Sequence, residues 1–271
     1  MTTVPAKISD NFLPPKAPST ARAQQIDFEK SNPPLPKYKD HFAAVIDDFL
    51  TETECKELLA LVESSTPNGW ERAMINIGGG KQRLSTDTRN CARIMWDTHD
   101  VADRLLARLM PFLHDLDIDQ FSNRTSVTGL IGRGKSYRVS ALNERLRFLR
   151  YVGGEYFRPH WDGQYEAPNG DLSYLTLHLY LNGDGEQDVV ELGKAEDRPG
   201  RVNPAPHEKL LGGATSFIPI PSYKSGNGQL RIFPRTGSVL IFQHSGLMHS
   251  GDPVFRGTKY TMRTDIMYRE V

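Results

Sequence analysis

Cysteine is scarce in this chain of 271 residues. There are two cysteines, Cys55 and Cys91, and their spacing matches no metal-binding cysteine pattern. Two thiols are also too few for the disulfide framework that stabilises small secreted domains. The composition therefore excludes a disulfide-rich fold and a cysteine-ligated zinc module, and it favours a reducing compartment.

Long apolar runs are missing as well. No stretch approaches the roughly 20 apolar residues that are needed to cross a bilayer. The first twelve residues, MTTVPAKISDNF, contain no apolar segment typical of a signal peptide. We therefore expect a cytoplasmic protein without a membrane partner.

An excess of charge of one sign is the third absence. The 33 Lys and Arg residues equal the 33 Asp and Glu residues, so the formal net charge is zero at pH 7. Proteins that bind the phosphate backbone of nucleic acids carry a basic excess. A nucleic-acid partner is therefore not expected, and the sequence leaves the oligomeric state open.

Proline sets the N-terminus apart from the rest. Seven prolines and few large apolar residues lie within residues 1–36. We expect residues 1–40 to form a tail or strap that builds no regular structure of its own. Residues 41–271 are expected to form a single domain, with helical support in 41–125 and a β core in 126–271.

The first part of this domain shows helical patterns. AAVIDDFL, residues 43–50, predicts a strand, and Thr51 with Glu54 forms a capping box that predicts the start of a helix. A second helix is expected over residues 100–116. The apolar stripes of the two helices are Cys55, Leu58, Leu59 and Val62, and Val101, Leu105, Leu109 and Phe112.

After about residue 125 the pattern changes to short alternating runs between Gly, Pro, Asn and Asp, which is typical of antiparallel strands. SYLTLHLYLN, residues 173–182, predicts one face with Tyr174, Thr176, His178 and Tyr180 and a buried face of leucines. Residues 237–244 and 259–268 predict further strands. The polar, charged insertion at residues 183–211 is expected to be a lid or a disordered loop, and we favour a lid.

A histidine and an aspartate in FRPHWDG raise the question of chemistry. His160 and Asp162 would point to the same face of a strand, about 6–7 Å apart. Non-haem iron oxygenases use two histidines and one carboxylate as metal ligands. The second histidine could be His249 or its rival His244, and Lys259, ten residues after His249, favours His249.

These segments together resemble a known family. FLRYVGGEYFRPHWDG, YLN, GGATSF and HSGDPVFRGTKY are similar to the catalytic core of the prolyl 4-hydroxylase-like Fe(II)- and 2-oxoglutarate-dependent dioxygenases. The family pattern has a tyrosine nine residues before the first iron histidine, a His-x-Asp pair, a distal histidine and a lysine ten residues further on. The resemblance covers about residues 145–268, and VIDDFLTETECKELL extends it more weakly toward residue 43.

The resemblance implies a fold, cofactors and roles for individual residues. The fold would be mainly β, a double-stranded β-helix or jelly roll with supporting N-terminal helices. Fe(II), 2-oxoglutarate and O₂ would be needed, with ascorbate supportive. The implied iron ligands are His160, Asp162 and His249. Lys259 would pair with the distal carboxylate of 2-oxoglutarate, Tyr151 would donate a hydrogen bond to it, and Thr176 and Tyr180 would line the same pocket or simply pack. His178 shares their face and is expected to be a satisfied core histidine.

Arg263 departs from the family pattern. It follows Lys259 by four residues and would lie on the same strand face, about 13 Å away. One small diacid does not easily bridge both cations. Arg263 could replace Lys259 as the anchor of 2-oxoglutarate, meet a second carboxylate such as that of the substrate, or pair with Asp265 for structural reasons.

A local basic excess bears on the substrate. Residues 133–150 hold six basic residues against Glu144 alone. Arg145 and Arg147 alternate with Tyr151 and could face the barrel, although a solvated rim is the simpler interpretation. The excess suits a substrate with a carboxylate, such as an amino acid.

The sequence therefore predicts an iron- and 2-oxoglutarate-dependent oxygenase that oxidises a C–H bond of a small carboxylate-bearing molecule and releases succinate and CO₂. Hydroxylation, desaturation and oxidative cyclisation all remain open. One alternative is a peptidyl-prolyl 4-hydroxylase. Another is a non-catalytic barrel that binds a metal or a ligand.

Overall fold

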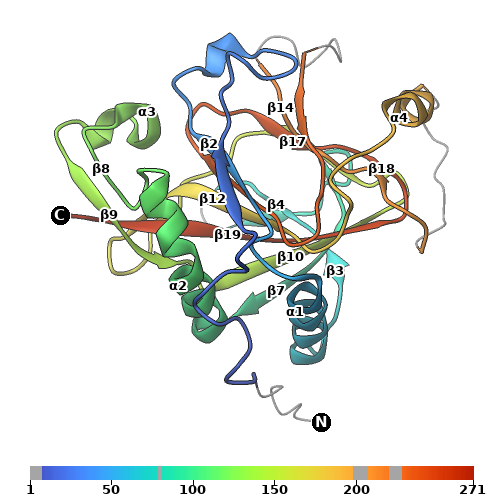
Figure 1. Ribbon diagram of the computed structural model, residues 1–271, viewed down its shortest axis with the longest axis horizontal. Coiled ribbons are helices and arrows are strands. Elements are labelled where there is room, and N and C mark those ends of the chain that lie inside the picture. The colour runs from blue at the N-terminus through green and yellow to red at the C-terminus, as the bar shows by residue number, and fades with distance from the viewer. Residues whose placement is uncertain (1–7, 79–80, 198–206, 220–227) are drawn as a thin grey trace.

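A computed structural model describes residues 8–78, 81–197, 207–219 and 228–271 of the chain. Two antiparallel sheets lie opposite one another, and helices cover the outer side of the larger sheet (Figure 1). The expectation of a mainly β protein is confirmed.

The larger sheet has ten strands in the described residues. Its order is β1–β2–β16–β12–β19–β10–β7–β3, and β9 joins it through β19, with β8 beyond. The strands are β1 (Arg22–Gln25), β2 (Ala43–Asp47), β3 (Glu71–Arg72), β7 (Ala92–Asp97), β8 (Gln120–Ser122), β9 (Ser136–Leu142), β10 (Arg145–Val152), β12 (Leu172–Tyr180), β16 (Val239–Gln243) and β19 (Thr258–Glu270).

The smaller sheet has five strands in the order β15–β14–β17–β11–β6. Two strand pairs stand outside both sheets: β4 with β5, and β13 with β18. The bounds of these strands are β4 (Ile75–Asn76), β5 (Gln82–Arg83), β6 (Arg89–Asn90), β11 (Tyr156–His160), β13 (Leu211–Gly212), β14 (Thr215–Phe217), β15 (Leu230–Ile232), β17 (His249–Gly251) and β18 (Val254–Arg256).

Eight of these strands have the connectivity of a jelly roll. In chain order, these strands are β10, β11, β12, β14, β15, β16, β17 and β19. Successive strands lie in opposite sheets, except that β14 and β15 are neighbours in the smaller sheet. The first strand pairs with the last, and the second pairs with the seventh. This nesting of hairpins closes a double-stranded β-helix, as the resemblance implied.

Four α-helices and two 3₁₀ turns complete the described part of the chain. The capping box predicted for the first helix is present, since the Thr51 backbone N–H donates to Glu54 and the Glu54 N–H donates to the Thr51 hydroxyl. The apolar faces of α1 and α2 pack on the larger sheet in one core cluster. The bounds are α1 (Glu52–Ser65), α2 (His99–Asp115), α3 (Thr125–Thr128), α4 (Val189–Glu196), η1 (Pro36–Tyr38) and η2 (Leu130–Gly132).

The N-terminal segment contributes more regular structure than the sequence indicated. Within it, β1 pairs antiparallel with β2 and so extends the larger sheet. An edge strand offers unpaired backbone groups, and β1 satisfies those of β2. Phe28 and Tyr38 are buried in a second core cluster, where the Tyr38 hydroxyl donates to the Ile218 carbonyl oxygen at 2.6 Å. Residues 1–7 lie outside the described residues.

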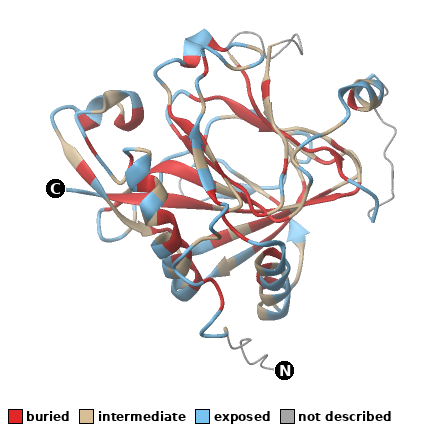
Figure 2. Cartoon of the chain, viewed as in Figure 1, coloured by how far each residue is buried: buried red, intermediate tan, exposed pale blue. Residues whose placement is uncertain are grey.

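The part of the chain expected to be helical support also supplies strands. β2 and β7 lie on either side of the four jelly-roll strands of the larger sheet. They therefore cover what would otherwise be two open edges. Figure 2 shows the result: buried residues follow the strands, and exposed residues lie on the outer faces of the helices.

One expectation for β12 is wrong. The register between β12 and β19 shifts between Ser173 and Leu175, which marks a β-bulge. A one-residue shift sends a side chain to the opposite face. Tyr174 consequently packs with Phe121 and Tyr268 in the outer core instead of sharing a face with Thr176.

The insertion between β12 and β14 begins with α4. Ion pairs hold this helix to the barrel: Arg256 of β18 pairs with Glu191, and Arg231 of β15 pairs with Glu196 at 2.6 Å. Residues 198–206 of the predicted lid lie outside the described residues. The role of the insertion as a lid stays a prediction.

Candidate active site

Two strands of the smaller sheet bring the predicted metal ligands together. β11 ends at His160, β17 begins at His249, and these two residues are cross-strand partners. Asp162 follows β11 by two residues. The His160 Nε2 atom lies 3.7 Å from Asp162 Oδ1, and the His249 Nε2 atom lies 3.7 Å from Asp162 Oδ2. One ligand atom from each residue lies within 4.8 Å of the others, so a single metal ion could be bound by all three.

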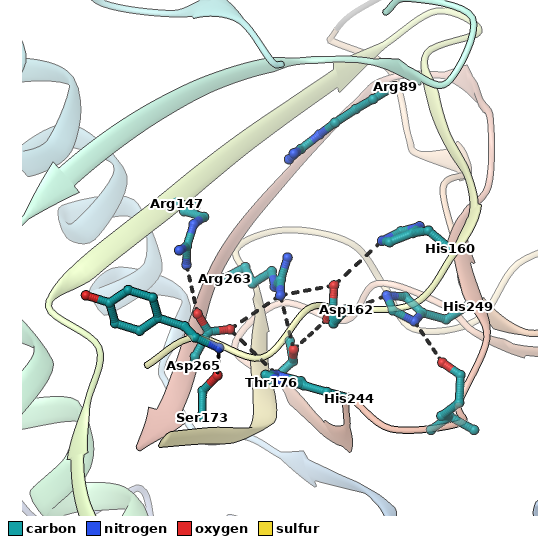
Figure 3. A network of polar contacts seen from close by, with 12 residues as sticks. Arg89, Arg147, His160, Asp162, Ser173, Thr176, His244, His249, Arg263 and Asp265 are labelled. Carbon is teal, nitrogen blue, oxygen red and sulfur yellow. Dashed lines mark hydrogen bonds and ion pairs between the residues drawn. The ribbon is translucent and has the colours of Figure 1, made fainter. Parts of the chain in front are cut away.

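Neighbouring groups orient these ligands (Figure 3). The Nδ1 atoms of His160 and His249 lie 2.8 and 3.2 Å from the backbone carbonyl oxygens of Arg158 and Leu247. An Nδ1–H that donates to a carbonyl leaves the Nε2 lone pair directed at the metal position. The Thr176 hydroxyl donates to Asp162 Oδ2 at 2.6 Å.

The electrostatic surroundings hold the ligands in their metal-binding protonation states. Burial, together with the nearby His249, lowers the pKa of His160 to about 3, and burial lowers the pKa of His249 as well. Burial alone would raise the pKa of Asp162, but Arg263 and the two histidines outweigh it and hold that pKa well below its ordinary value. Two neutral imidazoles and one carboxylate are a donor set that fits Fe(II).

A cavity of about 420 Å³, including its open mouth, adjoins these ligands. Its walls combine apolar rings with cations and come from both sheets. The residues that line it are Arg89, Leu149, Tyr151, Phe157, His160, Asp162, His178, Thr215, Phe242, His249, Ser250, Gly251, Lys259 and Arg263.

Lys259 is the most unusual charge in this cavity. The residue is 2% exposed, and its Nζ atom lies 5.2 Å from the ring centre of Tyr151 and 5.6 Å from that of Tyr180. It makes no ion pair with a carboxylate of the described residues, taking 4.0 Å as the limit. Burial lowers the pKa of Lys259 to about 8, against the opposing effect of Asp252. Two aromatic rings are weak substitutes for a counter-ion, so the site favours an anionic ligand.

Glycine makes room for this lysine. Gly213 lies in the GGATSF segment that resembles the family and has φ +73°. A Cβ atom there would lie 3.1 Å from Lys259 Cδ and 3.0 Å from Val254 Cγ2. Any larger residue would meet both the backbone strain and these contacts.

The other predicted cosubstrate residues lie around Lys259 and Asp162. Tyr151 is the cross-strand partner of Lys259 and lines the cavity. The Tyr180 hydroxyl donates to Thr215 Oγ1 at 2.7 Å, and the centre of the Tyr180 ring lies 5.6 Å from Lys259 Nζ. Thr176 is committed to Asp162 and is not among the cavity-lining residues.

Arg263 pairs with Asp265, which is one of the arrangements considered for it, and also with Asp162. Its Nη2 atom lies 3.0 Å from Asp162 Oδ1 and 3.3 Å from Asp265 Oδ1, so two carboxylates match it (Figure 3). Its side chain nevertheless lines the cavity, and its Nε–H is buried without a hydrogen bond within the described residues.

Arg145 and Arg147 do not line the cavity. Arg147 Nη1 lies 3.2 Å from Asp265 Oδ2. Arg145 is half-exposed and forms two hydrogen bonds with Asp97, at 2.9 and 2.7 Å. Both guanidinium groups therefore have carboxylate partners in the protein.

Among the cavity residues that sequence reasoning missed, two carry a cationic or imidazole group, Arg89 and His178. Arg89 comes from β6, which pairs with β11 across a long stretch of sequence, and no motif marks it. His178 was expected to be a satisfied core histidine. Its Nε2 atom is instead buried without a hydrogen-bond partner among the described residues. Its position on the alternating strand beside Thr176 and Tyr180 was the available signal.

A second cavity, of about 450 Å³, adjoins the other side of Asp162. His244, the rival metal ligand, lines it and is 5% exposed. Its Nε2 atom lies 3.7 Å from Asp265 Oδ1, and it does not belong to the three-residue ligand cluster.

No protein-family model matches the chain, and no curated protein does. Solved structures do. A viral collagen prolyl hydroxylase from Paramecium bursaria Chlorella virus-1, as its 2OG complex, is 20% identical with a TM-score of 0.45, over 83% of this chain and 95% of that one.

Two further matches are of the same kind. A Trichoplax adhaerens prolyl hydroxylase in complex with a hypoxia-inducible-factor peptide fragment is 16% identical, with a TM-score of 0.49 over 83% of this chain and 82% of that one. A Pseudomonas putida prolyl-4-hydroxylase is 14% identical, with a TM-score of 0.48 over 85% of this chain and 95% of that one. None of the helices in the described residues is long and apolar enough to span a membrane. The fold follows from the strand order described above, and the chemistry from the side chains of the site.

Proposed function

We propose that this protein is an Fe(II)- and 2-oxoglutarate-dependent oxygenase that oxidises a C–H bond of a small carboxylate-bearing molecule. The observation that carries the proposal is the pairing of two features in one cavity. One is the His160, Asp162 and His249 cluster, and the other is the buried cation of Lys259. A metal site alone would fit many functions, but a metal site beside a buried cation fits a dianionic ligand that binds both.

Fe(II) would be bound by the Nε2 atoms of His160 and His249 and by the carboxylate of Asp162. Bound there, the metal would supply the activation of O₂ that is coupled to decarboxylation of 2-oxoglutarate to succinate and CO₂. Three protein ligands leave the remaining coordination positions for the cosubstrate and O₂.

Lys259 would bind the distal carboxylate of 2-oxoglutarate. A buried carboxylate is costly unless it meets a cation, and Lys259 supplies that cation where water is excluded. The Tyr151 hydroxyl lies at the same end of the cavity and would donate to the cosubstrate. Gly251 lies close to that hydroxyl, because a Cβ atom on Gly251 would be 3.8 Å from it.

Apolar residues would protect the reaction from water. Leu149, Phe157 and Phe242 line the cavity, and the Phe157 ring stacks on the His160 ring at 3.6 Å between centres. Thr176 and Arg263 would hold Asp162 in position through its two oxygens. The protein's contribution is thus to orient the ligands and to keep the site dry.

The substrate class is the finer part of the proposal. A small carboxylate-bearing molecule is supported by Arg89, a cation of the cavity in addition to the Lys259 that 2-oxoglutarate would need. A peptidyl-prolyl substrate and a non-catalytic barrel remain as outcomes of the experiment.

The experiment measures succinate formed from 2-oxoglutarate with Fe(II), ascorbate and O₂, across panels of free amino acids and proline peptides. His160→Ala is the inactive variant. His114→Ala is the matched control, because the His114 side chain is 77% exposed and does not line the cavity. Succinate that rises with the amino-acid panel, and is lost in His160→Ala alone, supports the proposal.

Two results would contradict it. Stimulation by proline peptides alone would assign a peptide substrate. A protein that binds Fe(II) but forms no succinate under any of these conditions would be the non-catalytic barrel.

A further inference from the structure

Three cations line the cavity: Arg89, Lys259 and Arg263. Among the described lining residues, Asp162 is the single carboxylate. Arg263 is matched by Asp162 and Asp265. Lys259 would be matched by the distal carboxylate of 2-oxoglutarate. The remaining cation is Arg89, which forms no ion pair with the described residues at the 4.0 Å limit.

Arg89 lies close to the metal site. It is the cross-strand partner of Phe157, and its guanidinium carbon lies 4.7 Å from the centre of the Phe157 ring. The Phe157 ring in turn stacks on the His160 ring, with a separation of 3.6 Å and an angle of 22°. One aromatic ring therefore separates the guanidinium from a metal ligand, and Figure 3 shows the Arg89 side chain reaching toward the site.

The hydrogen-bonding capacity of this guanidinium is largely unused. Its Nη1 atom lies 3.4 Å from the Met74 carbonyl oxygen, which is at the limit of a hydrogen bond. Its Nε–H is buried without a partner among the described residues. A guanidinium carries five N–H donors in a planar fork that matches a carboxylate, and leaving buried donors unsatisfied is costly.

Other arginines near the site are already committed. Arg145 is held by Asp97 and Arg147 by Asp265. Neither lines the cavity, whereas Arg89 does. The carboxylates of 2-oxoglutarate are also committed, because one would meet Lys259 and the other the metal. An additional anion in the cavity would therefore find Arg89 without a carboxylate partner among the described residues.

We propose that Arg89 binds the carboxylate of the organic substrate and holds that substrate beside His160. This inference rests on the proposed function. It assigns substrate binding to a residue of the cavity, in place of the predicted Arg145 and Arg147. The group that is recognised is a free carboxylic acid, not an amide or an internal peptide segment.

The test uses the visible charge-transfer absorbance that 2-oxoglutarate gives with Fe(II) in the absence of O₂. The native full-length protein is loaded with both and titrated with a panel of free amino, hydroxy and aryl carboxylic acids and with their primary amides. We expect at least one acid to perturb the band and to raise succinate formation in air, and its amide to do neither. The 2-oxoglutarate concentration for half-maximal absorbance is measured in every variant.

Arg89→Gln should weaken the effective acid by about 10- to 100-fold, as expected for a lost hydrogen bond to a charged group. Arg89→Lys should restore part of that loss. Arg138→Gln is the matched control, since Arg138 is an exposed arginine of β9, and it should leave the titration unchanged.

The outcomes separate the two proposals. No charge-transfer band in the native protein would refute the proposed function and this inference together. A normal band that no acid perturbs, or equal effects of acid and amide, would overturn only the role of Arg89. A loss of 2-oxoglutarate affinity in Arg89→Gln, with the response to the acid intact, would also overturn it, because Arg89 would then serve the cosubstrate.

Discussion

Arg108 of α2 and Lys259 of β19 are both buried cations, 1% and 2% exposed, but their surroundings differ. Arg108 donates to both oxygens of Glu54, at 2.7 and 3.1 Å, and to the carbonyl oxygens of Pro14 and Phe49. Its donors therefore join α2, α1 and the N-terminal segment. Lys259 lies beside two aromatic rings and, among the described residues, forms no ion pair with a carboxylate at the 4.0 Å limit.

The difference separates structural charge from functional charge. A buried ion pair with its hydrogen bonds satisfied fixes how elements pack, and removing one partner is costly. A buried cation without a counter-ion destabilises the fold, so its presence indicates a ligand that supplies the missing charge. Arg108 in the helical region is of the first kind, and Lys259 in the cavity of the jelly roll is of the second.

The largest effect is expected from Lys259→Met. Removing the cation would leave the distal carboxylate of 2-oxoglutarate buried without a partner. Affinity for 2-oxoglutarate should fall by about 2 to 5 kcal/mol, or roughly 30- to 5000-fold. The measurement is a 2-oxoglutarate titration of the Fe(II)-loaded protein without O₂.

The same variant should not lose thermal stability, because it removes an unmatched buried charge. Lys209→Met is the matched control: the Lys209 side chain is 65% exposed and pairs with Asp184 at the surface. An unchanged 2-oxoglutarate affinity in Lys259→Met would mean that Lys259 does not bind the cosubstrate and is not a functional charge in this sense.

Arg108→Met should have the opposite profile. It leaves Glu54, whose side chain is 16% exposed, without its partner. We expect the free energy of unfolding to fall by about 3 to 5 kcal/mol, measured by urea denaturation. The folded fraction should bind 2-oxoglutarate with native affinity.

A second variant tests the cause of that loss. Replacing Glu54 by Gln together with Arg108→Met removes both charges and should recover part of the lost stability. If the single variant is as stable as the native protein, the pair does not join the helices in the way the contacts indicate.

The sequence was sufficient to predict that four polar residues from short motifs share one site. His160, Asp162, His249 and Lys259 come from short motifs, and the structure brings them to one cavity. The alternating runs and turn residues predicted antiparallel strands, and the jelly-roll connectivity was implied by the resemblance to the dioxygenase family.

Features that depend on long-range pairing were not predictable in this way. Arg89 reaches the cavity because β6 pairs with β11, and the contact joins residues more than sixty positions apart. Tyr174 was assigned to the wrong face because a bulge interrupts a strand whose alternation looks regular. The committed partners of Arg145 and Arg147 also come from distant strands.

A pH titration offers a smaller but more specific test of Lys259. Its pKa is lowered from an ordinary value of 10.5 to about 8, so between these values the unfolded chain binds more protons than the folded protein. The free energy of unfolding of the ligand-free protein should therefore rise with pH across this window, by about 3 kcal/mol in total. Affinity for 2-oxoglutarate should fall above pH 8, as the lysine loses its proton.

Both trends are read as the difference between the native protein and Lys259→Met, which removes the contribution of other titrating groups. A difference that stays flat from pH 8 to pH 10.5 would mean that the lysine keeps its ordinary pKa, and hence that its charge is matched in the free protein.

The smallest effect is expected from Arg145→Ala. Arg145 and Asp97 are joined by two hydrogen bonds, but their side chains are 51% and 52% exposed. Exposed ion pairs contribute about 0 to 1 kcal/mol, so stability should change little. Turnover of the substrate and of 2-oxoglutarate should stay at native values, in steady-state succinate assays. A selective rise in the KM for the substrate would instead indicate that Arg145, at the rim, also binds the substrate's carboxylate. A cation that is paired with a carboxylate of the protein would then bind a ligand as well, and the distinction between Arg108 and Lys259 would hold only for fully buried charges.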